Sequence, residues 1–154
     1  ATLTVTDSAL TGAGGLLEAD GTAVTLRRTR LLAADVLAPA AVRIAGGTVV
    51  LEQCTVSAGG RAQGIHLRDC GLVEMHTVRI DDASRGLVVE AAHSGRVDGL
   101  SIAARTLGID WQGAQPWTWS AVRVDAPTAV RGIDELDTDG RGADAEVLAG
   151  LPTP

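Results

Sequence analysis

The sequence predicts an all-β solenoid in which about six short coils stack on one another. The main reason is a template of apolar residues that recurs six times, with starting positions stepping by 21, 25, 24, 22 and 22 residues. A second short strand precedes most copies of this template. Helical periodicity is absent, and Gly and Pro interrupt the chain too often for long helices.

The template carries apolar residues at its first, third and eighth positions and a small or apolar residue at its sixth. Its six copies begin at Leu3, Val24, Val49, Val73, Gly95 and Trp117. Alternation with a period of two is typical of β-strands. Equivalent residues of successive copies are therefore predicted to stack in columns, and six coils would be roughly 30 Å long.

The second strand begins with Gly, then an apolar residue, a spacer and another apolar residue. It starts at Gly64, Gly86 and Gly108, and related copies start at Ala41 and Gly132. Gly64 is interpreted as a turn residue. The apolar residues after these positions are predicted to form one interior column: Val42, Ile65, Leu87, Ile109 and Ile133.

These repeated strands, Gly-Ile/Leu-x-Leu/Val and Val-x-Leu-x-x-Cys/Thr-x-Val, resemble the right-handed parallel β-helix family with the pectate-lyase-like fold. The resemblance covers about residues 2–149. It implies a single-stranded right-handed parallel β-helix of about six coils over residues 1–149, followed by a short C-terminal tail or linker at 150–154. Leucine-rich repeats have a similar period, but they require an Asn or Cys ladder and helical returns, and this chain contains no Asn.

The bulk composition restricts the function. The 154 residues form one domain with a net charge of −6, which argues against binding to nucleic acid. No run of eighteen apolar residues is present to span a membrane. The chain lacks Lys, Asn, Phe and Tyr, residues with AT-rich codons, which indicates a GC-rich genome, and we expect a bacterial one.

A polar face is predicted on the second strand, where residues between the inward positions must point outward. The candidate ligand-binding residues on this face are His66, Arg68, Glu90, Asp110, Gln112 and Asp134. Acids on neighbouring coils would lie near 5 Å apart, and those one coil further near 10 Å, which covers the separations that glycosidases use. In the enzymes that the chain resembles, the equivalent sheet carries the substrate groove, with acids that bind calcium or act as acid and base.

Two classes of function fit these observations. The leading hypothesis is a non-catalytic structural or binding module of a bacterial surface protein or phage-like tail apparatus, with an extracellular or particle-surface location favoured. Its first strand, at about Thr2, has no capping helix before it, so a neighbouring domain or a second copy is expected to cover that end. The enzyme signatures Asn-Thr-Asp, Gly-His-Gly and Arg-Ile-Lys are absent.

The alternative is a polysaccharide lyase or glycoside hydrolase, in which His66, Asp110 and Asp134 would be catalytic. A polysaccharide is the partner expected for this face. No cofactor is predicted, and calcium would be needed only by a lyase. His66, His76 and His93 fall in different parts of the coil, so no metal site is predicted from them.

The remaining candidates are two cysteines and three tryptophans. Cys54 occupies a template position filled elsewhere by small or apolar residues, so it is predicted to be buried and unreactive. Cys70 lies in a turn without an evident His partner. Trp111, Trp117 and Trp119 belong to one coil, and we interpret them as a wide core layer, with an exposed sugar-stacking platform as the alternative.

Overall fold

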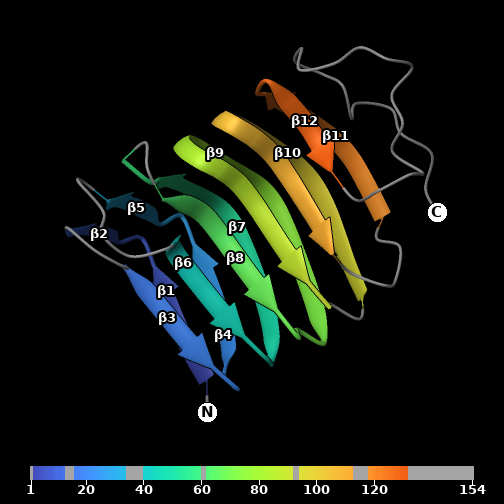
Figure 1. The fold of residues 1–154 in the computed structure, drawn as a ribbon. Coiled ribbons are helices and arrows are strands. Elements are labelled where there is room, and N and C mark those ends of the chain that lie inside the picture. Colours follow the sequence, from blue (N-terminus) through green and yellow to red (C-terminus); the bar gives the residue numbers. More distant parts are fainter. Residues whose placement is uncertain are drawn as a thin grey trace.

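Every regular element in the described part of the chain is a β-strand, and in the computed structural model these strands stack as a solenoid of about five turns (Figure 1). The structure describes residues 2–12, 16–33, 40–59, 62–91, 94–112 and 118–131. The predicted domain boundary at 149 and the tail at 150–154 lie outside these residues. The strands are β1 (Thr2–Thr6), β2 (Ala9–Gly12), β3 (Leu17–Asp20), β4 (Ala23–Arg27), β5 (Arg30–Ala33), β6 (Ala40–Ala45), β7 (Thr48–Ser57), β8 (Gln63–Arg68), β9 (Leu72–Glu90), β10 (Ser94–Gln112), β11 (Thr118–Asp125) and β12 (Thr128–Arg131).

All strand pairs are parallel, and they form three faces of the solenoid. The first sheet consists of β3, β6, β8, the last residues of β9 and β10, and β12. The second sheet consists of β1, β4, the first halves of β7, β9 and β10, and the start of β11. The third consists of β2, β5 and the following residues of β7, β9, β10 and β11. β9 and β10, with 19 residues each, therefore pass around the corners of the coil as single long strands.

The strand register confirms the columns predicted from the repeat. Val24 pairs with Val49, and Val49 pairs with Val73, on the second sheet. Val42, Ile65, Leu87 and Ile109 stack on the first sheet, and each is 0% exposed. Apolar residues of all three sheets meet in one core, so the spacing of the template is explained by the burial of alternate side chains along each strand, with one extra residue at the bend.

The last coil departs from the predicted register. Val130 lies beside Ile109, a position that the sequence pattern assigned to Ile133. The physical reason is the short link: β12 begins after a turn at Ala126–Pro127, and Val130 follows the interior residue Val124 by only six positions. Ile133 itself lies outside the described residues.

Each coil turns from the second to the third sheet through one residue with positive φ. These bend residues are Asp7, Arg28, Gln53, Thr77, Gly99 and Ala121, with φ of 51°, 48°, 53°, 57°, 83° and 53°. The left-handed conformation costs a residue other than Gly about 1–2 kcal/mol. The first bends are also linked between coils, because the amides of Asp7 and Arg28 donate to the carbonyls of Arg27 and Glu52 at 3.0 and 2.9 Å.

The glycines at 64 and 86 serve packing between coils. Gly64 was predicted to be a turn residue, but it is buried inside β8. A Cβ atom on Gly64 would lie 2.7 Å from the carbonyl oxygen of Gly86 and closer still to Ile80 Cγ2. A Cβ atom on Gly86 would lie 2.8 Å from the carbonyl oxygen of Gly108. The glycine column is therefore explained by close approach of neighbouring coils rather than by a turn.

Candidate functional site

The predicted polar face is the outer face of the first sheet, and its centre is a contact between His66 and Glu90. β8 supplies His66 and the end of β9 supplies Glu90, one coil further along. His66 Nε2 lies 2.8 Å from Glu90 Oε2. The two side chains are 17% and 34% exposed, so the imidazole is partly shielded from water while the carboxylate is more open.

Asp110, the central acid of the predicted site, is buried. Its carboxylate is only 2% exposed although it projects from the outer side of the sheet. Arg85 Nη1 lies 3.1 Å from Asp110 Oδ2, and Gln112 Nε2 lies 3.5 Å from the same oxygen. A buried carboxylate requires a charge partner or hydrogen-bond donors, and Arg85 and Gln112 supply both.

Arg85 was not predicted from the sequence. It lies in the last third of β9, where it pairs in register with Leu107 of β10, and its side chain reaches a residue of the next coil, 25 positions away. No sequence pattern distinguishes this arginine from the others, so only the fold reveals its role.

Two other predicted residues are placed differently. Arg68 is 58% exposed, and its Nε lies 3.6 Å from a carboxylate oxygen of its neighbour Asp69. Asp134 was expected to follow Asp110 in its column, but that register position belongs to Arg131. Asp134 lies outside the described residues. His66 and Asp110 thus share the predicted column through Val88, but the position predicted for Asp134 in that column is wrong.

The polar face also begins earlier in the chain than predicted. Glu18 pairs in register with Arg43, and Arg43 with His66. Glu18, Asp20 and Arg43 are exposed and line a hollow of about 350 Å³. The alternation Leu17-x-Ala19 could have revealed this strand, but the first coil lacks the glycine start that identifies the later ones.

Both cysteines are buried, as expected for Cys54. Their exposed fractions are 1% for Cys54 and 0% for Cys70. The thiol of Cys54 donates to the carbonyls of Glu52 and Leu26 at 3.2 and 3.3 Å. Burial raises the pKa of both thiols, and it outweighs the opposing backbone hydrogen bonds. Neither cysteine is suited to nucleophilic chemistry, which needs an accessible thiolate.

The structure describes the side chain of one of the three tryptophans. Trp111 is 7% exposed and belongs to the core, which confirms the buried interpretation for this residue. Trp119 lies in register with the interior residue Val97, but its side chain is outside the described part of the structure. Trp117 is also outside the described residues.

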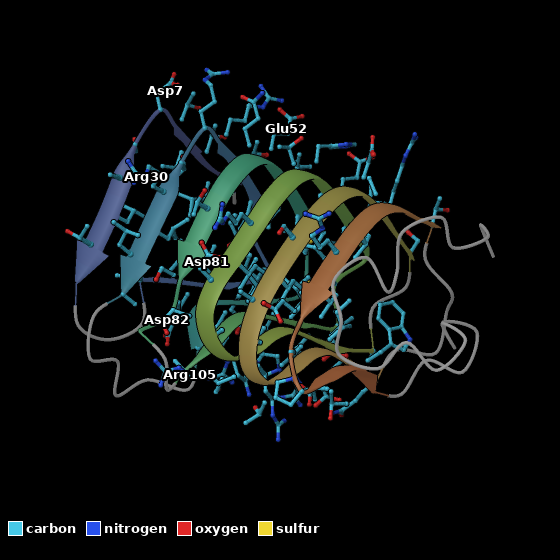
Figure 2. The ribbon with its side chains drawn as sticks, turned by 90° about the horizontal axis from the view of Figure 1, so that it is seen from above. Asp7, Arg30, Glu52, Asp81, Asp82 and Arg105 are labelled. Atoms are coloured by element: carbon cyan, nitrogen blue, oxygen red, sulfur yellow. The ribbon has the colours of Figure 1, made fainter. Side chains whose placement is uncertain are left out.

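Two further hollows lie on other faces. One, of about 510 Å³, runs along the bend between the second and third sheets, past Thr77, Arg79 and Ser101. The other, of about 500 Å³, includes Asp82 and Arg105, whose side chains form an ion pair of 3.0 Å between neighbouring coils. Figure 2 shows this pair projecting from the outside of the solenoid.

The described residues contain no group of three or more His, Cys, Asp or Glu side chains that could hold a metal ion. Within the same residues, no helix is long and apolar enough to cross a membrane. On the first sheet, two contacts join charged side chains of neighbouring coils, His66 with Glu90 and Arg85 with Asp110. No protein-family model, curated protein or solved structure matches the chain, so its likeness to pectate-lyase-like proteins depends on the repeat alone.

Proposed function

We propose that this chain is a non-catalytic structural or binding module, a rigid β-solenoid segment of a larger bacterial or phage-like surface or tail assembly. The observation that carries this proposal is that the candidate acids of the polar face are paired with other side chains or buried. Glu90 binds His66 at 2.8 Å, and Asp110 is 2% exposed beside Arg85. A catalytic acid or base must reach the proton that it transfers, and the Asp110 carboxylate faces an arginine instead of solvent.

Contacts between coils support a mechanical role. Arg28 binds Asp7 of the preceding coil at 2.9 Å, and this hydrogen bond lowers the pKa of Asp7. Arg27 and Glu52 form a similar bridge of 3.0 Å. Such exposed pairs stabilise a fold only weakly. Their value here is to link neighbouring coils at the surface, in addition to the parallel backbone ladders that hold the coils together.

The alternative function is a polysaccharide lyase or glycoside hydrolase that uses the same face. The contact between His66 and Glu90 favours it, because a carboxylate can orient an imidazole for general-base catalysis. This alternative would depend on His66, since Asp110 is buried and the register position after it belongs to Arg131.

Incubation with a panel of acidic and neutral polysaccharides, with and without calcium, separates the two functions. Our proposal predicts no product in any of these reactions. Product formation by the natural chain that is abolished in His66→Gln, with Arg105→Gln as the control for an exposed charge elsewhere, would establish the enzyme alternative instead.

A further inference from the structure

The hollow of about 510 Å³ at the bend between the second and third sheets extends across four coils. Each of these coils contributes a bend residue and a residue of the third sheet to its lining. The bend residues are Gln53, Thr77, Gly99 and Ala121, and the residues of the third sheet are Thr55, Arg79, Ser101 and Arg123. Four coils at the spacing of paired strands extend over about 14 Å. The hollow is therefore elongated along the solenoid axis, a shape that suits a chain-like ligand.

Differences in side-chain length between neighbouring coils explain this hollow. In the outward column of the third sheet, Ser101 pairs in register with Arg79 on one side and with Arg123 on the other. The bend residue beside Ser101 is Gly99, which has no side chain. A gap is therefore left between the two arginines, which lie two coils, or about 10 Å, apart. Buried residues of the neighbouring interior column also line the hollow: Cys54, Val78 and Leu100.

The bend that carries the hollow is described in every coil. Its backbone passes from the second sheet to the third without a gap in the described residues. The undescribed links connect other pairs of sheets: 13–15, 34–39 and 60–61 join the third sheet to the first, and 92–93 and 113–117 join the first to the second. The shape of the hollow is thus set by the side of the solenoid and does not depend on either end of the stack.

The lining of the hollow is positively charged, in contrast to the chain as a whole. Among its described lining residues the charged ones are Arg79 and Arg123, both exposed, although the chain carries a net charge of −6. Arg79 Nε donates to Asp81 at 2.8 Å, and its two Nη groups have no partner among the described residues. Guanidinium groups bind carboxylates and similar oxyanions through paired hydrogen bonds. The hollow is therefore complementary to acidic groups spaced about 10 Å apart.

The uncharged polar residues of the lining favour a ligand that is rich in hydroxyl groups. Thr55, Thr77 and Ser101 offer hydroxyls, which both donate and accept hydrogen bonds. Gln53 adds an amide with the same property. The strands beneath the hollow pair with one another, so a peptide cannot be bound between them by strand addition. Side chains must therefore recognise the ligand, and a glycan supplies hydroxyls between its charged groups.

We propose that this hollow binds a linear anionic glycan, with one acidic group at Arg79, a second at Arg123 and sugar hydroxyls over Ser101. The site lies on a different face from the first sheet, for which a polysaccharide was predicted. The proposal rests on the function as a binding module and specifies its ligand. The glycan is bound without being cleaved, because no described lining residue is an Asp, Glu or His that could transfer a proton.

Titration calorimetry of the natural chain with soluble glycans tests this site. Alginate and dextran sulfate distinguish a carboxylate from a sulfate as the acidic group, and neutral dextran has neither. At least one of the two anionic glycans is expected to bind, and dextran is not. Arg79→Gln and Arg123→Gln should each weaken binding roughly tenfold, because each removes charge-assisted hydrogen bonds. Arg96→Gln, which removes an exposed arginine of the second sheet, is the matched control and should leave the affinity unchanged.

Failure to bind either anionic glycan would overturn the site, as would equal binding of dextran. An equal loss of affinity in Arg96→Gln would also overturn it, because the effect would then reflect net charge alone. Equal or tighter binding of poly-L-glutamate would replace the glycan with an acidic peptide as the ligand. None of these outcomes bears on catalysis, so they leave the proposed non-catalytic function standing. Product formation from a bound glycan would instead refute that function and retain the site.

Discussion

The stacked bends offer a quantitative test of the fold, and Thr77 is the most informative residue among them. Its φ is 57°, a left-handed conformation that is unfavourable for a β-branched side chain. Asn tolerates this conformation better because its short side chain can bond to the local backbone. Thr77 is exposed, so replacing it removes no buried contact. From the left-handed penalty alone, Thr77→Asn should raise the free energy of unfolding by about 1 kcal/mol.

The assay is urea unfolding followed by circular dichroism, with the free energy taken from linear extrapolation. Thr55→Asn is the matched control, because Thr55 lies within the extended strand β7, where Asn is a poor residue. The control should be neutral or destabilising. If Thr77→Asn gives no gain, or if Thr55→Asn gives the same gain, the strain assigned to the bend is incorrect.

Three other predictions concern the interior. Gly86→Ala should cost about 1–3 kcal/mol through overpacking against Ile102, whereas Gly71→Ala, whose Cβ would meet its nearest atom at 3.7 Å, should be nearly neutral in the same unfolding assay. Cys54 and Cys70 should resist thiol reagents in the folded chain, and rapid labelling of either would contradict their burial. Because burial raises the pKa of both thiols, their contribution to stability is complete below the unfolded thiol pKa of about 8.5 and is lost as pH rises above it. Unfolding free energy should therefore fall with pH in this alkaline range, and replacement of both cysteines by Ala should remove that part of the slope.

The solenoid could be predicted from the sequence because every coil places a residue at the same set of interior positions. Each coil must supply an apolar side chain to the same columns, so Val49, Val73 and their equivalents recur at nearly constant spacing. The last coil is an exception to this regular spacing. Gly132-Ile133 resembles the Gly-Ile start of earlier strands, but the short turn before β12 brings Val130 into register with Ile109 first.

The outer surface was harder to predict, because burial and pairing there depend on side chains that reach between coils. An outward position was expected to mean an exposed residue, yet Asp110 is covered, and Arg85 contacts it from 25 positions earlier in the chain. The bend residues were also not predicted, because their residue types do not mark a left-handed backbone. Their left-handed backbone is usually marked by Gly or Asn, but here the column contains residues as different as Arg28, Gln53 and Ala121.

We propose that the polar face serves the fold rather than a reaction, and the stability of the Asp110→Asn variant tests this proposal most directly. If the Asp110 carboxylate stabilises the fold by binding Arg85, its replacement by an amide should lower the unfolding free energy by about 2 kcal/mol. The exposed carboxylate Asp125, changed to Asn in parallel, should alter it by no more than about 0.5 kcal/mol. An increase in stability for Asp110→Asn would contradict the account, because groups held in place for catalysis typically reduce the stability of the fold.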